Sequence, residues 1–371
     1  MTFLEAVQYC IQHQFIFAAY RLPGADSSVL LIQKDPEPHI AGDKAVWFSS
    51  KGFLLYPFAS DNASPAVMIH GDYEFFEQGN NFTGALPLPG SRGVNIPTEG
   101  ATTDTHAKEF KAQVAALVQE VKKGVFQKVV LSRTLTKRGR LKPQAAWLFQ
   151  ALTVAYPNAF SYIAFTGQQL WAGATPEPFL LSGAKHYYTA SVAATRKALP
   201  GHLQIAQWNT KELVEQALVT EFIQRTLQHE SIYGVEMQGP SPVLAGNLIH
   251  LKTTFRIPKR NIENKVVSLI HRLHPTPAVC GIPRDEAFRF ILSQEKHHRG
   301  YYSGFLGPVN PDFSFHLFVN LRCVQLRSES FVLYMGAGIT DASDPDLEWE
   351  ETGLKSETLL SVIEQISTEN I

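Results

Sequence analysis

The sequence has few cysteines, and those it has are dispersed. Among 371 residues there are only three, Cys10, Cys280 and Cys323. An odd, scattered set of thiols argues against a disulfide framework and against a clustered metal site. We therefore expect the protein to work in a reducing cytoplasm.

The sequence also lacks a surplus of either charge. Lys and Arg number 33 against 34 for Asp and Glu, which leaves no basic excess for nucleic acid or anionic lipid. No apolar run is long enough to span a membrane. The amino terminus carries Glu5 and has no basic residue before its first apolar residues, so it does not resemble a signal peptide. A small molecule is the expected partner, with no nucleic acid and no membrane.

Several nucleotide and metal motifs are missing as well. There is no P-loop, no Gly-x-Gly-x-x-Gly after a strand and no His-Glu-x-x-His. What is present is a 44% hydrophobic composition, enough to bury a large core. The chain should be globular.

Apolar residues alternate between helical and strand spacing along the whole chain. Helical patterns are expected at the start and around residues 110–121, 145–156, 209–229, 266–274 and 285–295, and a closing helix carries Glu348 and Glu351. Residues 79–105, rich in Gly, Pro, Ser and Thr, indicate a long loop. Between these lie strand patterns, among them single runs over residues 170–183, 301–309 and 315–326. Consecutive strands at hairpin spacing predict a largely antiparallel α+β fold.

The segment 334–357 combines a glycine turn with an acidic helix. Gly336 and Gly338 leave backbone N–H groups open to an anion. Glu348, Glu351 and Lys355 then fall on one helical face, where carboxylates could hold a hard cation and the ammonium could meet a substrate carboxylate. The alternative is a solvated face with a Glu–Lys pair.

A second pair of acids has the same spacing. Asn209 and Glu212 form a capping-box pattern, and Glu215 shares a helical face with Glu212. Oxygen ligands without a Cys or His cluster favour Mg²⁺ over zinc.

Four further residues could carry chemistry. Lys128 precedes an apolar strand, where burial would lower its pKa towards that of a general base; alternatively it is an edge lysine reaching solvent. Glu177 lies in a tight Thr-Pro-Glu-Pro turn. Apolar surroundings could raise the pKa of its carboxyl so that it can donate a proton; alternatively it is an ordinary solvated turn residue. His250 could be a ligand-lining or a core histidine. Arg322, in an apolar strand, needs an anionic partner such as a carboxylate.

Taken together, these segments resemble the chorismate-utilising enzymes and, within them, the isochorismate synthases. The similarity covers roughly Thr105 to Ile366 and rests on an ordered set of segments: KVVLSR, GATPEP, ASVAATR, KELVEQ, LHPTPAVCGIP, RGYYSGFLG, NLRC, GAGI and EWEETGLKSET. The resemblance implies one large domain over 1–371, with stacked, mainly antiparallel sheets covered by helices. Residues 1–104 carry no site motif, and 105–366 form the chorismate-binding region.

The resemblance also implies roles for individual residues. Lys128 would be the base that activates water, and Glu177 the acid at the departing hydroxyl. Glu215 and Glu351 would bind Mg²⁺, with Glu212 and Glu348 in support. The residues implied to hold or line the substrate are Thr195, His250, Ala278, Tyr302, Arg322, Gly336, Gly338 and Lys355.

Within the family, three positions point to water as nucleophile and to release of isochorismate. Relatives that use ammonia generally lack the lysine matching Lys128, so no glutaminase subunit is expected. Aminodeoxychorismate synthases that use a nucleophilic lysine carry it where this chain has Ala193, and salicylate-forming relatives tend to have Thr where Ala278 stands. Two positions depart from the family pattern: Ala194 replaces a usual glycine, and Gln216 replaces a usual histidine.

The expected reaction is Mg²⁺-dependent conversion of chorismate into isochorismate by a monomer. The alternatives are a salicylate or anthranilate synthase on the same scaffold, or a catalytically silent metabolite-binding homologue. The sequence leaves open whether the product would feed menaquinone or siderophore synthesis.

Overall fold

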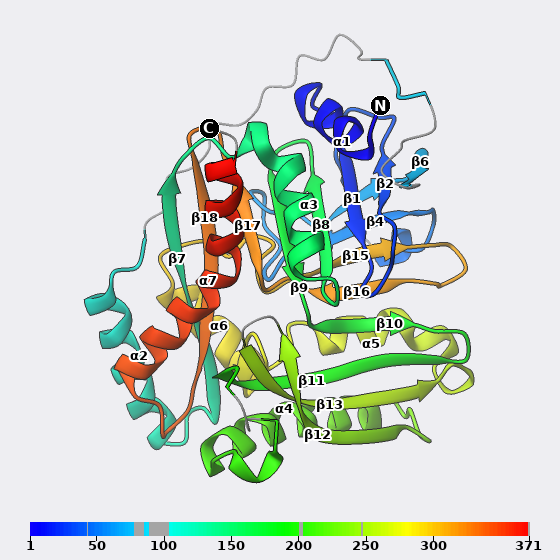
Figure 1. The fold of residues 1–371 in the computed structure, drawn as a ribbon. Coiled ribbons are helices and arrows are strands. Elements are labelled where there is room, and N and C mark those ends of the chain that lie inside the picture. Colours follow the sequence, from blue (N-terminus) through cyan, green and yellow to red (C-terminus); the bar gives the residue numbers. More distant parts are fainter. Residues whose placement is uncertain (43, 78–84, 89–103, 200–202, 246–247, 370–371) are drawn as a thin grey trace.

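The computed structural model of the chain describes residues 1–42, 44–77, 85–88, 104–199, 203–245 and 248–369. Most of the loop predicted over residues 79–105 lies outside these ranges. Within them, the strands form two sheets of nine strands each, and all neighbouring strands pair antiparallel (Figure 1). The predicted α+β class with mainly antiparallel sheets is confirmed.

The first sheet carries the strand that begins at Lys128. Its strands, in spatial order, are β14 (Gly281–Ile282), β7 (Lys128–Arg138), β18 (Ser330–Ile339), β17 (Cys323–Leu326), β9 (Leu170–Thr175), β8 (Phe160–Phe165), β1 (Phe17–Arg21), β2 (Val29–Ile32) and β6 (Tyr73–Phe76).

The second sheet carries His250. Its strands, in spatial order, are β12 (Glu236–Ala245), β13 (Leu248–Pro258), β11 (His186–Lys197), β10 (Pro178–Ser182), β16 (His316–Val319), β15 (Phe305–Val309), β4 (Gly52–Tyr56), β5 (Val67–His70) and β3 (His39–Ile40). In Figure 1 its strands run from side to side, whereas those of the first sheet run from top to bottom.

Helices cover the outer faces of both sheets. The α-helices are α1 (Phe3–Gln12), α2 (Ala107–Lys122), α3 (Ala145–Ala155), α4 (Thr210–His229), α5 (Val266–Leu273), α6 (Arg284–Gln294) and α7 (Pro345–Glu369). Short 3₁₀ turns lie at Lys44–Val46, Lys142–Gln144, Ile205–Gln207, Lys259–Asn261 and Glu263–Lys265. Among the described residues, no helix has the length and apolar character needed to cross a membrane.

Burial on both faces explains why many strands are apolar throughout rather than alternating. In β1, Phe17 and Ala19 pack in the cluster with α1, α3 and α7, whereas Ala18 and Tyr20 pack in the cluster between the two sheets. A third cluster lies between the second sheet and helices α4 and α5. Each face of such a strand is removed from water, so both faces need apolar side chains.

Two runs that the sequence presents as single strands pass from one sheet to the other. The run 170–183 divides into β9 in the first sheet and β10 in the second, and the run 315–326 divides into β16 in the second and β17 in the first. The prediction of single strands was therefore wrong in both places. The predicted run 301–309 is also shorter, because only Phe305–Val309 is strand.

The two crossings lie side by side and are bonded to each other. Thr175 Oγ1 donates to the Val319 carbonyl at 2.5 Å, and the Val319 N–H donates to the Glu177 carbonyl at 3.0 Å. The Ala174 N–H donates to the Arg322 carbonyl at 2.9 Å. Glu177 and Arg322 are thus neighbours because each sits where the chain changes sheet.

Candidate active site

A cavity of about 70 Å³ opens where the two crossings meet β7, β18 and helix α4. Most of the predicted site residues line it. Those that do are Lys128, Glu177, Thr195, Glu215, His250, Ala278, Tyr302, Arg322, Gly336, Gly338 and Lys355. The predicted residues outside its lining are Glu212, Glu348 and Glu351.

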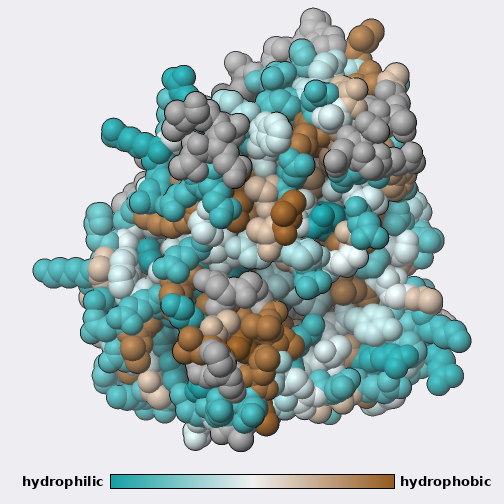
Figure 2. All heavy atoms as spheres, in the orientation of Figure 1, coloured by the Kyte–Doolittle hydropathy of each residue, from teal (hydrophilic) through white to brown (hydrophobic). Residues whose placement is uncertain are grey.

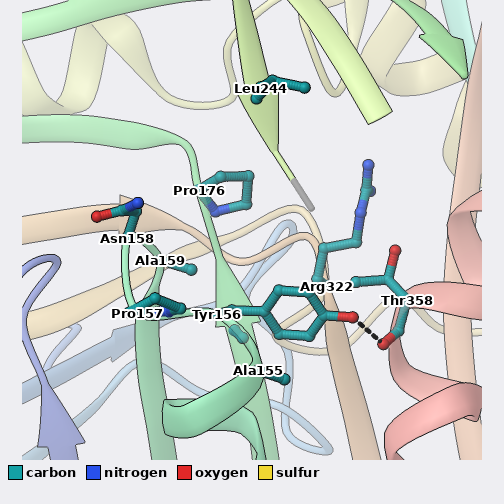
Figure 3. Close-up of a pocket in the computed structure, with 10 residues that line it drawn as sticks. Ala155, Tyr156, Pro157, Asn158, Ala159, Pro176, Leu244, Arg322 and Thr358 are labelled. Atoms are coloured by element: carbon teal, nitrogen blue, oxygen red, sulfur yellow. Dashed lines mark hydrogen bonds between the residues drawn. The ribbon is translucent and has the colours of Figure 1, made fainter. Parts of the chain in front are cut away.

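A larger cavity of about 260 Å³ adjoins the first and shares Pro176 and Arg322 with it (Figure 3). Its remaining lining is mostly small or apolar, and the Tyr156 hydroxyl donates to the Thr358 carbonyl at 2.7 Å. The titratable groups converge on the smaller cavity, so we assign the chemistry there. In Figure 2, apolar side chains gather on the neighbouring surface beside the ends of β11 and β12, where Leu244 of β12 is exposed.

Glu177 is a buried acid rather than a solvated turn residue. The residue is 5% exposed, and burial raises the pKa of its carboxyl to about 8 in spite of the nearby charges of Arg322, Lys128 and Lys355. The carboxyl therefore holds its proton at neutral pH. The tight turn predicted around it is instead the extended passage from β9 to β10.

Lys128 is fully buried in the strand pairing of β7, between β14 and β18. The alternative of an edge lysine that reaches solvent is excluded, since the residue is 1% exposed. Its Nζ lies 2.9 Å from Oε1 of Glu215 on helix α4. Burial opposes the charge on Glu215, but Lys128, with Lys355 and Lys211, holds the pKa of Glu215 below its ordinary value.

Each of the four predicted metal-binding carboxylates contacts a basic side chain. Glu212 accepts from Arg196 Nε at 2.6 Å and from the Asn209 N–H at 2.9 Å, in the predicted capping box. On α7, Glu351 lies 2.6 Å from Lys355. The Glu–Lys pairing that the sequence left open on α7 is therefore present, but on a half-buried face.

The fourth carboxylate, Glu348, is 2% exposed and lies 2.7 Å from Nζ of Lys211. Burial and the neighbouring charge of Glu351 raise the pKa of Glu348. Lys211 in turn experiences the charges of Glu348, Glu215 and Glu351. Lys211 is therefore in contact with Glu348 and within range of the charges of two further carboxylates, one on α4 and one on α7.

No three Asp, Glu, His or Cys side chains within the described ranges already stand together as a metal site. Each predicted ligand instead forms an ion pair with its own basic side chain. The donor set itself suits a hard divalent cation, because it consists of carboxylate oxygens on two facing helices. A cation of that kind would take over the charge balance that the lysines now provide.

Gly336 and Gly338 matter for a reason other than the predicted one. Both lie inside β18, paired with Ser132 and Val130, rather than in an anion-binding turn. A Cβ at Gly338 would stand 2.6 Å from Glu215 Oε1 and 2.7 Å from Lys128 Cε. A Cβ at Gly336 would stand 2.9 Å from the Tyr302 hydroxyl. Glycine is needed here because side chains from other elements cross over the strand.

Arg322 is available to bind an anion. Within the described part of the chain its guanidinium has no hydrogen bond or ion pair, and burial lowers its pKa. It borders both cavities (Figure 3). Arg322 lies in the link between β16 and β17, not inside a strand as predicted, and Lys355 approaches the same cavity while donating to the Gly336 carbonyl at 2.8 Å.

His250 is neutral and faces the cavity from β13. Burial lowers its pKa to about 3. Its Nδ1 lies 3.2 Å from the Ala194 carbonyl, which can only accept, so Nδ1 carries the hydrogen and Nε2 is left as an acceptor. Thr195 Oγ1 lies 3.1 Å from the same nitrogen. The ring is therefore fixed in orientation by β11.

A family model described as chorismate binding enzyme matches residues 91–364. The chain belongs to the chorismate-binding enzymes. The match covers the segments on which the sequence resemblance rests and every residue that we assign to the site.

The curated relatives agree with this membership, and a solved structure shares the fold. The chain is 29% identical over 261 residues to the vibriobactin-specific isochorismate synthase of Vibrio cholerae, an alignment that covers 68% of this chain and 66% of that relative. It is 26% identical over 305 residues to the isochorismate synthase EntC of Escherichia coli, covering 80% and 77%. The solved structure of MenF, the menaquinone-specific isochorismate synthase from Escherichia coli, has the same fold, with a TM-score of 0.75 at 21% identity and coverage of 96% and 91%.

The structure explains the first departure of this chorismate-binding chain from the family pattern. Ala194 has φ 59°, in the left-handed region, at a bulge in β11. Glycine adopts this backbone without the cost of roughly 1–2 kcal/mol that an L-residue incurs. The Ala194 methyl group packs with Trp208, Ile249 and Leu251, and this burial offsets part of the cost.

The second departure, Gln216, does not line the cavity. It is 1% exposed, and its Nε2 lies 3.0 Å from Ser191 Oγ and 3.2 Å from Thr253 Oγ1. Gln216 therefore fastens α4 to β11 and β13, next to the predicted ligand Glu215.

Three charged residues near the site were not predicted. Lys252 lies near enough to Glu177 to affect its pKa, and its position two residues after His250 on β13 could have indicated the same face. Lys211 and Arg196 pair with Glu348 and Glu212, respectively. No spacing in the sequence relates them to those acids, because each pair joins different elements.

Proposed function

We propose that this chorismate-binding enzyme converts chorismate into isochorismate. Water adds at C2, the hydroxyl leaves from C4, and the ring double bonds shift between the two positions. The observation that carries the proposal is that a buried lysine, Lys128, and a buried glutamic acid, Glu177, line one cavity. Such a pair can remove one proton and supply another within a single reaction.

In this assignment Glu177 is the acid and Lys128 the base. Glu177 holds its proton at neutral pH, because burial raises its pKa to about 8, and it would give that proton to the departing C4 hydroxyl. Lys128, as the neutral amine, would take a proton from the water that attacks C2. Its Nζ now lies 2.9 Å from Glu215 Oε1, and this contact would have to lengthen for the amine to reach the attacking water.

The two carboxylates of chorismate require cationic and polar partners. Arg322 is the strongest candidate, since its guanidinium suits a carboxylate and has no hydrogen bond or ion pair within the described residues. Lys355 and the Tyr302 hydroxyl would complete this side of the site, and His250 Nε2 and Thr195 would accept from or donate to the substrate hydroxyl. Ala278, Gly336 and Gly338 would shape the walls.

Mg²⁺ is the cofactor that the donor set favours. Glu215 and Glu351 would hold it, with Glu212 and Glu348 in support, and it would supply positive charge beside the dianionic substrate. Without it the carboxylates of α4 and α7 would repel that substrate. Lys211 now contacts Glu348 and lies within range of the charges of Glu215 and Glu351, so its ammonium group would have to move when the cation binds.

The names of the relatives support the same reaction, since two of them are isochorismate synthases. We further propose a monomeric cytoplasmic enzyme that needs no glutaminase subunit. We take water, not ammonia, as the nucleophile, because Lys128 as a base would activate water while Glu177 acts as the acid.

The proposal is tested by incubating the protein with chorismate and Mg²⁺ and separating the products by chromatography. A mixture of chorismate and isochorismate is expected. Accumulation of salicylate and pyruvate would instead make it a salicylate synthase, and anthranilate formed with added ammonium would make it an anthranilate synthase. No conversion, with chorismate bound, would indicate a metabolite-binding protein.

A comparison of wild type with Ala278→Thr addresses product choice. The methyl group of Ala278 cannot orient the enolpyruvyl side chain, and one hydrogen bond to a reacting group is worth about 1–3 kcal/mol, or roughly ten- to a hundredfold in partitioning. The variant should therefore form more salicylate than wild type.

A further inference from the structure

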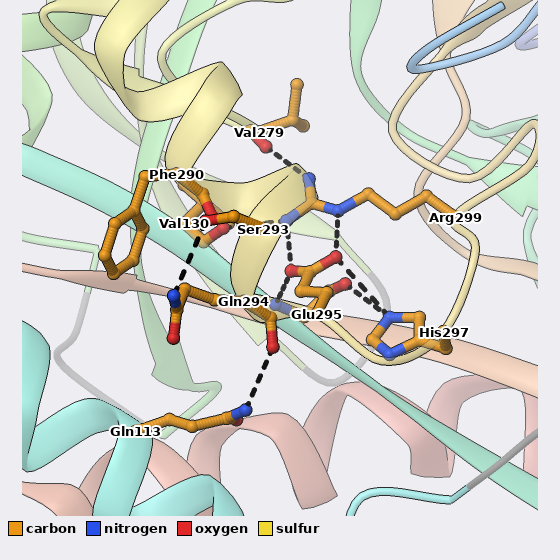
Figure 4. A network of polar contacts seen from close by, with 10 residues as sticks. Gln113, Val130, Val279, Phe290, Ser293, Gln294, Glu295, His297 and Arg299 are labelled. Carbon is orange, nitrogen blue, oxygen red and sulfur yellow. Dashed lines mark hydrogen bonds and ion pairs between the residues drawn. The ribbon is translucent and has the colours of Figure 1, made fainter.

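A buried ion pair lies behind the wall of the candidate active site (Figure 4). Glu295 directly follows α6, and Arg299 lies four residues further on; their side chains are 5% and 3% exposed. Arg299 Nε donates to Glu295 Oε2 at 2.8 Å, and Nη2 donates to Oε1 at 2.6 Å. This two-bond geometry offsets the cost of burying both charges.

The Arg299 guanidinium also holds two backbone carbonyls. Nη1 donates to the Val279 carbonyl at 2.7 Å, and Nη2 donates to the Val130 carbonyl at 2.8 Å. Both valines line the active-site cavity. Val130 lies two residues after Lys128 on β7, and Val279 directly follows Ala278. One side chain therefore joins the strand that carries the proposed base to the loop that carries Ala278.

Glu295 makes a further contact with β7, and the Arg299 guanidinium lies close to two aromatic rings. Glu295 Oε1 accepts from the Ser132 N–H at 2.7 Å, a second attachment to β7. The Arg299 guanidinium lies 4.2 Å from the ring centroid of Phe58 and 6.0 Å from that of Tyr302, which lines the cavity. The Tyr302 N–H donates to the Arg299 carbonyl at 3.0 Å.

These contacts depend on the shape of a guanidinium. Its N–H groups lie in one plane and point in fixed directions, so it can reach one carboxylate and two carbonyls at once. An ammonium group has three donors on a single atom and cannot span these partners. A purely structural ion pair would need only the contact between Arg299 and Glu295. Here the guanidinium also donates to the carbonyls of Val130 and Val279, which line the cavity.

We propose that Arg299 is a positioning residue for the reaction. Through the Val130 and Val279 carbonyls it fixes Lys128 relative to Ala278 and Tyr302, while touching no substrate itself. The proposal rests on the proposed function, because the geometry it fixes is that of the proposed base. A displacement of about 1 Å in a reacting group can cost on the order of a hundredfold in rate.

The test compares Arg299→Lys with wild type and with Arg284→Lys. Arg284 is the matched control, since at the other end of α6 it also contacts a carboxylate, that of Asp285, and donates to a backbone carbonyl, that of Arg272, without lining the cavity. With chorismate and Mg²⁺, R299K should lose roughly ten- to a hundredfold in kcat. Its KM should change by less than about threefold, because Arg322 and Lys355 are held by other elements; R284K should stay within about twofold on both.

Hydrogen exchange supplies a readout that needs no turnover. In R299K, backbone amides of residues 126–135 and 274–282 should exchange faster than in wild type, and those of β1 and β8 should not. Wild-type kcat in a folded R299K, a loss confined to KM, or an equal loss in R284K would overturn the proposal.

If R299K does not fold, Glu295→Gln provides the second variant, because it keeps the bonds to both carbonyls but removes the charge that orients the guanidinium. It should lose part of kcat at unchanged KM, and a wild-type kcat would refute the proposal. Should the wild type itself not convert chorismate, the proposed function fails. The exchange measurement then still decides whether Arg299 orders the cavity wall.

Discussion

The carboxyl of Glu177 illustrates how a single residue acquires its chemistry from burial. Nothing within three residues of it carries a charge, yet four basic side chains from other parts of the chain surround it, and burial still keeps its pKa near 8. Those cations would stabilise the charged form in water. Loss of hydration is the larger effect, and it makes the residue an acid at neutral pH.

The first prediction concerns the pH dependence of the reaction. Since Glu177 must be protonated to act, kcat/KM should fall as pH rises through about 8. Glu177→Gln should lower the rate by roughly a hundredfold or more, and the residual rate should lack this alkaline limb. Glu286→Gln, on the exposed side of α6, serves as control. An unchanged profile in E177Q would mean that another group is the acid.

The second prediction concerns stability. The pKa of Glu177 is raised in the folded state, so the folded protein binds this proton more tightly than the unfolded chain between about pH 4.5 and 8. The free energy of unfolding should therefore decrease as pH rises through this window, by on the order of 1 kcal/mol for each pH unit. Glu177→Gln removes the effect. Its Tm should exceed that of wild type at pH 8 and approach it at pH 5, and a constant difference would contradict the assignment.

At the scale of elements, the site exists because two strand runs change sheet. Glu177 and Arg322 lie at those crossings, and backbone hydrogen bonds from Ala174 to Arg322 and from Val319 to Glu177 hold the crossings together. Regular pairing within one sheet would have placed both residues in a ladder, where their side chains would face only one layer. At the crossings they reach the space between the sheets.

The third prediction concerns the attachment of α4. Gln216 joins this helix to β11 and β13 through Ser191 and Thr253, and Gln216→Leu would leave those buried polar groups without their amide donor. The cost should be about 1–3 kcal/mol in the free energy of unfolding, measured by denaturant titration. Gln224→Leu, on the exposed face of the same helix, should cost less than about 0.5 kcal/mol. Equal effects of the two substitutions would argue against a specific attachment.

At the scale of the whole molecule, α4 and α7 approach each other from segments more than a hundred residues apart, and each contributes carboxylates. Lysines now balance these charges: Lys211 with Glu348, and Lys355 with Glu351. Such a group of charges is sensitive to any cation that competes for it. Binding a divalent ion should therefore connect the two helices and stabilise the fold.

The fourth prediction follows from this connection. Mg²⁺ at a hundred times its Kd should stabilise the folded state by about 2.7 kcal/mol, seen as a rise in Tm that excess chelator reverses. Glu215→Gln and Glu351→Gln should each remove the rise and abolish activity while leaving the protein folded. Glu221→Gln, exposed on α4, should retain both. A rise of the same size in E215Q and E351Q would place the ion elsewhere.

The sequence by itself determined the helices, most strands and the antiparallel class, which follow from local periodicity because each depends on neighbours within a few positions. Most of the site residues were assigned through the resemblance to a family, which rests on short motifs in a fixed order. The long loop over residues 79–105 and the division at residue 104 stay predictions.

Only the tertiary structure decided where strands change sheet, which cation meets which carboxylate, and whether Glu177 is dry or solvated. The runs 170–183 and 315–326 each look like a single strand in the sequence. The residues that pass between the sheets are flanked by apolar strand segments on both sides, so no local pattern marks the change of sheet. Lys211 and Arg299 were not singled out, since their partners come from distant segments. Burial and charge pairing are set by the packing of those segments, and local patterns do not encode them.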